Sequence, residues 1–178
     1  MSRTADDARR AELLDRAVDY VCRVGLADLS LRPLAKAIGS SPRVLLYYFG
    51  SKESLVVEIV RRGRARQRSM MAELKCVVNS PKDVARALWR EWSKPEWEPL
   101  TRLSFEVYTL ALTDPSRFPG FLESSVKEWL DAMQGCTATQ ATMLIAGFRG
   151  FLLDLLATHD RARIDRAVKR WLEAVYDV

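Results

Sequence analysis

The chain has a single histidine, and this scarcity limits the chemistry that its side chains can perform. His159 stands beside Asp160 near an expected helix end, where a capping or surface role is favoured over that of a catalytic base. Any Ser–His–Asp or Cys–His site would have to centre on this one residue. The sequence also lacks a P-loop and a Gly-rich dinucleotide fingerprint. We therefore expect a protein that is not an enzyme and uses no cofactor.

Cysteine is scarce too. Cys22, Cys76 and Cys136 are odd in number and widely spaced, which fits neither a zinc site nor a disulfide scaffold. The uninterrupted apolar runs are too short to span a bilayer, and the first residues show no apolar segment of the signal-peptide type. These observations predict a cytoplasmic protein with no metal and no membrane partner.

The charge is distributed unevenly along the chain. Residues 1–68 hold 14 Lys and Arg against 8 Asp and Glu, whereas residues 69–178 hold 14 against 15. The overall net charge of +5 therefore arises from the first third of the chain. This pattern is typical of a nucleic-acid-binding module attached to a neutral domain, although ordinary variation in surface charge is an alternative.

Apolar residues at helical spacing, punctuated by Gly, Pro and capping residues, predict an all-α fold with a sizeable core. The first helix covers 9–24 and ends at Gly25, and a long helix capped by Ser51 runs to about 78. The other expected helices cover a short segment after Ser30, then 42–48, 81–93, 98–113, 120–134, 138–158 and 161–176. Three helices thus form an N-terminal unit, and the rest form a bundle.

Two short helices flank a tight turn at Ile38-Gly39-Ser40. Ser30 is a suitable N-cap for the first, with Pro33 in its first turn, and Ser41-Pro42 starts the second. Two short helices around such a turn are the DNA-reading helix-turn-helix unit.

The second short helix carries groups suited to DNA. Arg43 can donate to guanine O6 and N7 or to phosphate, and Val44 can touch a thymine methyl group. We expect at least one of Tyr47 and Tyr48 to face outward and contact a phosphate, and Lys52 to attract another at the next helix N-terminus. The alternative is that these residues pack the small core. That alternative is favoured for four apolar residues: Leu34, Ile38, Leu45 and Phe49.

The motif resembles the TetR (tetracycline-repressor) family of transcriptional regulators. The residues that carry the resemblance are Gly25, Ser30, Leu34-Ala35, Gly39, Ser41, Leu45, Tyr47-Tyr48-Phe49 and Ser51-Lys52-Glu53-Ser54-Leu55. The resemblance implies a DNA-binding domain over 1–54, a helical ligand-binding and dimerisation domain over 55–178, and a homodimer that binds operator DNA. By position it implies DNA contacts from Ser30, Arg32, Ser41, Arg43, Val44, Tyr47, Tyr48 and Lys52.

The motif departs from the family pattern at three positions. Leu46 stands where many members have a tyrosine, so the contact made there is absent or moved to Tyr47. Pro42 and Arg43 replace a more usual Lys-Gly pair, so the operator sequence cannot be transferred from the family.

Aromatic residues gather between 89 and 129. An aromatic-rich helical bundle can enclose an apolar cavity that binds a small molecule. For any single aromatic residue, however, packing in the hydrophobic core is favoured over lining a pocket. With the family resemblance, we expect a pocket for a small apolar or aromatic effector lined by Trp89, Trp92, Trp97, Phe105, Tyr108, Phe121, Trp129, Met133 and Phe148. Glu91, Arg102, Glu106 and Arg149 are candidates for orienting polar ligand groups, with surface charges as the favoured alternative.

The helix over 138–158 is apolar around much of its circumference and needs burial on more than one side. Gly147 and Gly150 would allow another helix to approach closely. With the last helix, it is expected to form a four-helix bundle across a two-fold axis, as the resemblance also implies. The expected dimer residues are Leu144, Phe148, Leu152, Leu155, Leu156, Ile164, Val168, Trp171 and Leu172, unless these helices are simply interior.

These observations predict a dimeric DNA-binding regulator, a repressor released from its operator by a small apolar molecule. The alternative is a ligand-independent dimeric DNA-binding protein whose aromatic bundle is only structural.

Overall fold

The computed structural model describes residues 3–26, 29–77, 80–133 and 135–176. All the regular secondary structure within these residues is helical, as predicted. The helices are α1 (Arg3–Val24), α2 (Leu31–Ala37), α3 (Pro42–Phe49), α4 (Lys52–Val77), α5 (Pro81–Trp92), α6 (Glu98–Thr113), α7 (Phe121–Ala132), α8 (Ala138–Thr158) and α9 (Arg161–Tyr176). Short 3-10 helices cover Pro95–Trp97 and Pro115–Arg117.

Local signals place most helix ends. Ser41, Ser80 and Thr137 are N-caps whose hydroxyl oxygens accept backbone N–H groups in α3, α5 and α8. Ser30 stands at the N-cap of α2, but its side chain makes no capping hydrogen bond to the described residues, contrary to our expectation. α1 begins at Arg3 rather than residue 9, because the polar first turn carries no apolar stripe that would mark it.

The chain divides into two compact units. Unit 1 comprises residues 1–67 with 102–119, and unit 2 comprises 68–101 with 120–178. α4 and α6 each contribute residues to both units. The predicted DNA-binding domain, 1–54, lies wholly in unit 1, which also takes in the start of α4 and most of α6.

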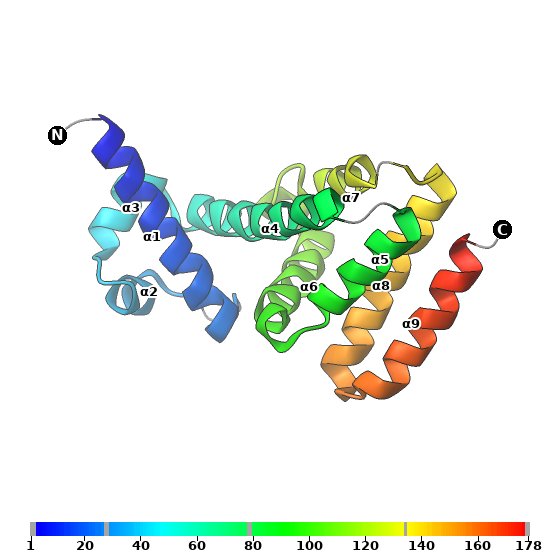
Figure 1. The fold of residues 1–178 in the computed structure, drawn as a ribbon. Coiled ribbons are helices and arrows are strands. Elements are labelled where there is room, and N and C mark those ends of the chain that lie inside the picture. Colours follow the sequence, from blue (N-terminus) through cyan, green and yellow to red (C-terminus); the bar gives the residue numbers. More distant parts are fainter. Residues whose placement is uncertain (1–2, 27–28, 78–79, 134, 177–178) are drawn as a thin grey trace. The chain divides into compact units, whose positions relative to one another are not determined.

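In unit 1, α1, α2 and α3 pack together (Figure 1). Apolar residues at helical spacing on α1 are buried: Leu13, Ala17, Val18 and Val21 are inaccessible to solvent. Leu34, Ile38, Leu45 and Phe49 are buried as well, so the core role favoured for these four residues is confirmed.

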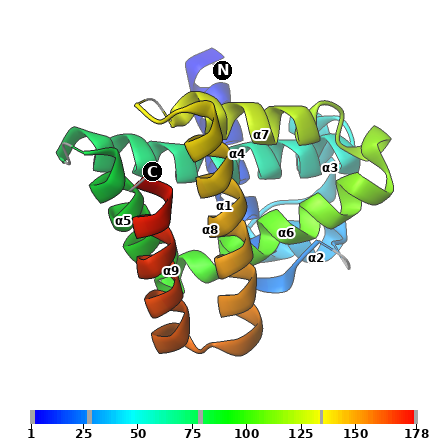
Figure 2. The ribbon, with the colours of Figure 1, turned by 90° about the vertical axis from the view of Figure 1, so that its right-hand side faces the viewer.

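In unit 2, α8 and α9 lie side by side, with α5 against α9 and α7 against α8 (Figure 2). Their shared core contains Leu88, Trp89, Leu144, Phe148 and Ile164, among others. The strongly amphipathic α5 and α9 each bury one apolar face in this core.

Within the described residues, α8 alone is long and apolar enough to cross a membrane by length and composition; the mean hydropathy of its best 18-residue window is 1.5. Buried core helices of soluble proteins pass the same test, but only 22% of this window is buried inside the structure. The expectation above considered uninterrupted apolar runs, which Arg149 and Asp154 break in α8. A window average tolerates two such residues.

Candidate nucleic-acid interface

The turn between α2 and α3 has the geometry of a helix-turn-helix. Ile38 donates its N–H to Leu34 O at 3.1 Å to close α2, and Gly39 follows with a φ of 69°, a conformation that favours glycine. The Ser41 side chain then accepts the N–H of Val44 at 3.3 Å, and Pro42 occupies the first turn of α3. These contacts fix where the second short helix starts.

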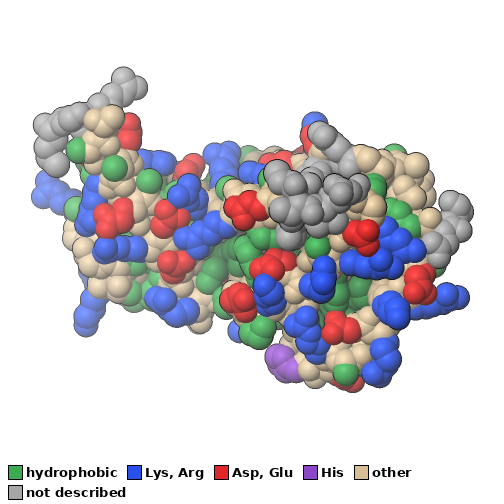
Figure 3. Space-filling view, in the orientation of Figure 1, with side chains coloured by type: hydrophobic (Ala, Val, Ile, Leu, Met, Phe, Trp, Pro, Cys, Tyr) green, Lys and Arg blue, Asp and Glu red, His purple; other side chains and the backbone are tan. Residues whose placement is uncertain are grey.

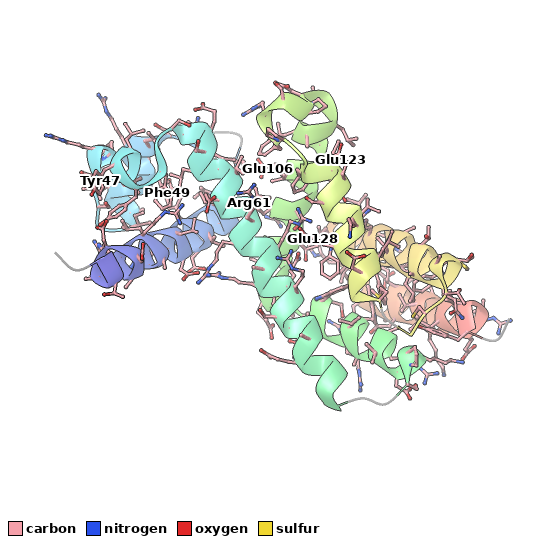
Figure 4. The ribbon with its side chains drawn as sticks, turned by 90° about the horizontal axis from the view of Figure 1, so that it is seen from above. Tyr47, Phe49, Arg61, Glu106, Glu123 and Glu128 are labelled. Atoms are coloured by element: carbon pink, nitrogen blue, oxygen red, sulfur yellow. The ribbon has the colours of Figure 1, made fainter. Side chains whose placement is uncertain are left out.

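α3 has one buried face and one exposed face. Leu45 and Phe49 point into the core of unit 1, and the opposite side carries Arg43, Val44, Leu46 and Tyr47, all exposed. Tyr47 is 74% exposed, so the expectation that at least one of the two tyrosines faces outward is confirmed. Figure 4 labels Tyr47 and Phe49 on α3.

Tyr48 is half-buried and already has a partner. Its phenol donates a hydrogen bond to Asp6 Oδ1 at 2.7 Å, tying the end of α3 to the first turns of α1. This hydrogen bond to a carboxylate, with some desolvation, raises the pKa of Tyr48, so the phenol stays protonated. Nearby, the Arg10 guanidinium lies 5.0 Å from the centre of the Phe49 ring and anchors the same two helices.

The other predicted DNA contacts surround α3. Ser30 precedes α2, Arg32 lies in its first turn, and both are exposed. Ser51 accepts the N–H of Ser54 at 3.0 Å and so caps α4, which begins at the exposed Lys52. The structure thus places all eight predicted residues in the helix-turn-helix or at its ends. Ser41 and Tyr48 differ from the others because the hydroxyl of each already has a hydrogen-bond partner within the chain.

Several residues that hold this interface in place were missed by the sequence reasoning. Asp15 on α1 accepts both Nε and Nη2 of Arg62 at 2.8 Å, and Nη2 of Arg66 at 3.0 Å. Arg66 also bonds Asp19 at 2.7 Å. The Arg62 guanidinium, followed by that of Arg66, holds the pKa of the Asp15 carboxyl below its usual value. The sequence signal was weak, since partners 47 and 51 residues apart leave no local pattern.

Glu106, on the part of α6 that belongs to unit 1, was another residue with an unforeseen role. Its Oε1 accepts the backbone N–H of Leu26 at 2.8 Å, immediately after α1 ends at the left-handed Gly25. The sequence makes Glu106 a candidate for orienting polar ligand groups, whereas in the structure its carboxylate accepts the Leu26 N–H. Glu106 is labelled in Figure 4.

Five of the nine aromatic and apolar residues predicted to line an effector pocket share one cluster in unit 2. Trp92 contacts the Trp129 ring edge-to-face at a centroid distance of 5.2 Å and the Phe148 ring at 5.8 Å, and Trp89 stacks on Phe148 at 6.3 Å. Met133 is buried in the same cluster. Trp97 and Phe121 belong to unit 2 as well, whereas Phe105 and Tyr108 lie in the segment of α6 assigned to unit 1.

The indole N–H of Trp92 is buried and has no acceptor within the described part of the chain. A pocket of about 160 Å³ opens beside this residue, between the α5–α6 connection and the α8–α9 turn. Its lining includes Leu152, Leu155, Leu156 and Arg161. This volume is close to that of a cavity known to hold benzene, so it admits a ligand of about one aromatic ring.

The charged ligand-orienting candidates in unit 2 are held by protein partners. Glu91 pairs with Lys94 at 2.6 Å and accepts the indole N–H of Trp97 at 3.2 Å. The Lys94 ammonium lowers the pKa of this carboxyl. Arg149 donates to the backbone oxygen of Ser125 at 3.4 Å.

α8 packs tightly on α9 at Gly147, as expected for close helix approach. A Cβ at this position would overlap the indole ring of Trp171, whereas Gly150 has open space around it. Leu144, Phe148, Ile164, Val168 and Leu172, all expected at a dimer interface, are buried within the single chain. Trp171, Leu152, Leu155 and Leu156 are partly exposed.

The exposed side of α8 is a different stripe. Met143, Ala146, Gly150, Leu153 and Ala157 are all exposed and recur at alternating spacings of three and four residues. We call these five residues the α8 stripe. It is apolar and uncharged, the pattern of a helix face that packs against another helix.

His159 ends α8 in a left-handed conformation with a φ of 53° and is exposed, as the capping interpretation requires. Figure 3 shows this histidine at the molecular surface. Among the described residues no three His, Cys, Asp or Glu side chains come together as a metal site.

A basic unit with an exposed second helix after a tight turn defines a DNA-binding protein of the helix-turn-helix class, and known proteins agree. Residues 13–59 match the sequence model of bacterial regulatory proteins of the tetR family. The HTH-type transcriptional repressor AcnR of Corynebacterium diphtheriae is 28% identical over 116 residues, which are 65% of this chain and 57% of AcnR. The chain therefore aligns with little more than half the length of that relative.

Solved structures are similar over nearly the whole chain. A transcriptional regulator from Rhodococcus sp. Rha1 superimposes with a TM-score of 0.79 at 16% identity, covering 94% of this chain and 96% of that one. The multidrug binding protein EbrR, complexed with imidazole, gives 0.65 at 26% identity, covering 96% and 93%. The match to the tetR family model covers the helix-turn-helix, so the resemblance seen in the sequence is confirmed. AcnR is a transcriptional repressor, in agreement with the expectation that this chain is not an enzyme.

Proposed function

We propose that the chain is a homodimeric repressor that binds double-stranded operator DNA in the cytoplasm and leaves it when a small apolar or aromatic effector binds. The observation that carries DNA binding is the two-sided α3. Leu45 and Phe49 anchor it in the core, while Arg43 and Tyr47 are presented to solvent in a basic domain. A recognition helix needs this division, because its outer residues enter the major groove.

The homodimer is supported by the α8 stripe. An apolar helix that buries so little of itself in its own chain needs a covering surface. A second copy of the same helix supplies one across a two-fold axis and also pairs two recognition helices for a palindromic operator. The α8 stripe would then form the contact surface between the two copies. The buried residues that the sequence predicts at this interface would lie in the core of each copy, behind the stripe.

The effector is supported by the aromatic cluster, the neighbouring pocket and the unpaired indole N–H of Trp92. A buried donor without an acceptor costs about 1–3 kcal/mol, which a ligand acceptor would recover. EbrR, a relative of the same fold, is a multidrug binding protein seen with imidazole and with ethidium.

The effector would act through α4, a single helix that contributes residues to both units. Tilting or locking α4 would move the two recognition helices away from the spacing of the operator half-sites. A ligand with equal affinity for both arrangements would have no effect, so the effector must bind one of them more tightly.

A ligand-independent dimeric DNA-binding protein is the second candidate, and the close ring–ring packing of Trp89, Trp92, Trp129 and Phe148 favours it. Titration of candidate small aromatics, followed by tryptophan fluorescence and melting temperature, separates the two. A ligand that shifts both and lowers operator affinity supports release; a ligand that binds and leaves operator affinity unchanged contradicts it.

The first experiment measures binding to DNA from upstream of the chain's own gene and to a randomised duplex library, at two salt concentrations. We expect salt-sensitive, sequence-selective binding. Arg43→Ala should cost about 1–3 kcal/mol if it contacts a base. Arg90→Ala on α5 is the control, because it removes the same charge from an exposed position in unit 2. Equal losses of DNA affinity in the two variants would show that binding is a non-specific attraction of charges, and this would contradict the proposal.

A further inference from the structure

The outer face of α3 is largely apolar. Arg43 and Tyr47 are four residues apart and therefore share one line along the helix. Val44, 36% exposed, and Leu46, 41% exposed, flank this line on opposite sides, one helical step of about 100° from it. A large aliphatic side chain left in water on a DNA-reading helix needs an apolar surface to contact.

The same face has little hydrogen-bonding capacity. The Ser41 oxygen accepts the N–H of Val44, and the Tyr48 phenol donates to Asp6. Arg43 and Tyr47 are thus the polar side chains of α3 that are fully presented to solvent. A helix with one bidentate donor cannot distinguish several base pairs by hydrogen bonds alone.

Thymine is the one DNA base with a methyl group in the major groove. We propose that Leu46, together with Val44, reads thymine methyl groups on either side of the base contacted by Arg43, so that Leu46 is a specificity-determining residue. The proposal rests on the DNA-binding function proposed above and specifies what the operator must contain. It also gives a role to the leucine that replaces the tyrosine common in the family.

The test removes single methyl groups from the DNA. An operator is first obtained by selection from a randomised duplex library with the full-length protein, and each thymine is then replaced by deoxyuridine, which leaves the base pairing unchanged. We expect wild-type affinity to fall about fourfold at each contacted position, which corresponds to about 0.8 kcal/mol per buried methyl-sized group. Leu46→Ala should abolish this dependence at one thymine position, and Val44→Ala at another.

Leu112→Ala is the matched control, since this leucine lies on α6 in unit 1 and is 68% exposed. It should retain the full methyl dependence, and melting curves confirm that each variant is folded. Selective operator binding that is indifferent to deoxyuridine at every position would overturn the methyl readout and leave the DNA-binding function standing. A selection that enriches no sequence would overturn both.

Discussion

The carboxylate of Glu106 accepts the backbone N–H of Leu26 at 2.8 Å, across 80 residues of sequence. The contact lies where α1 ends, and Leu26 is nearly inaccessible to solvent. An unpaired buried N–H costs about 1–3 kcal/mol, so α6 contributes to the stability of unit 1 through this hydrogen bond.

Glu106→Ala should therefore lower the free energy of unfolding by about 1–3 kcal/mol, because the Leu26 N–H loses its acceptor. Glu106→Gln keeps an oxygen at the same place and should lose less. Urea unfolding measures both. Equal destabilisation by the two variants would show that the carboxylate charge, and not the acceptor, is what matters.

The Asp15–Arg62 contact predicts a pH dependence. The Arg62 guanidinium lowers the folded-state pKa of Asp15 below its unfolded value of about 3.9. The resulting stabilisation is fully present above the unfolded pKa and is lost as the pH falls through the folded pKa. Asp15→Asn should thus destabilise the protein at pH 7, by up to about 1 kcal/mol for a partly exposed bidentate pair, and its difference from wild type should shrink below pH 4.

Asp7→Asn is the control for this pH series, because Asp7 lies on the same helix and its side chain is exposed. Urea midpoints are compared at several pH values between 7 and 3. A difference between Asp15→Asn and wild type that is constant over this range would contradict the assignment.

The two glycines of α8 should respond in opposite ways to alanine. Gly147→Ala places a methyl group into the Trp171 ring and should cost about 1–3 kcal/mol of stability. Gly150 has open space around it in the single chain, so Gly150→Ala should stabilise the helix by up to about 1 kcal/mol where no second chain contacts it. Thermal unfolding at low protein concentration measures both. A neutral Gly147→Ala would contradict the close α8–α9 packing.

The α8 stripe should control assembly. Leu153→Glu puts a charge at an exposed apolar position, and a charge buried without a partner in an interface is strongly unfavourable. We expect a dimer for the wild type and a folded monomer for the variant by sedimentation velocity. Leu112→Glu, at a leucine of unit 1 that is even more exposed than Leu153, should remain dimeric. A dimeric Leu153→Glu protein would place the interface elsewhere.

The two neighbouring tyrosines should separate stability from DNA binding. Tyr48→Phe removes the hydrogen bond to Asp6 and should lower stability by about 0.5–1.5 kcal/mol with a smaller effect on operator affinity. Tyr47→Phe should do the reverse, because its phenol is exposed. Melting temperature and operator affinity are measured for both. A larger loss of affinity in Tyr48→Phe would show that its hydroxyl leaves Asp6 for DNA.

The sequence by itself determined most of the helices, the helix-turn-helix and its resemblance to the tetR family. The ends of α6, α8 and α9 match the predicted residues, and Ser41-Pro42 starts α3 as expected. These features depend on residues within about four positions of each other, because helical hydrogen bonds and caps are local. Only the tertiary structure decided which of these side chains form hydrogen bonds with distant parts of the chain. Tyr48 meets Asp6 and Glu106 meets Leu26 through contacts 42 and 80 residues apart.

The same distinction holds for α8. Its apolar character was evident in the sequence, but a helix that is apolar around much of its circumference does not show which of its sides its own chain covers. Packing against α9 buries Leu144 and Phe148 and leaves Met143 and Leu153 exposed. That choice depends on where the neighbouring helices lie, which is a property of the folded bundle and not of the local sequence.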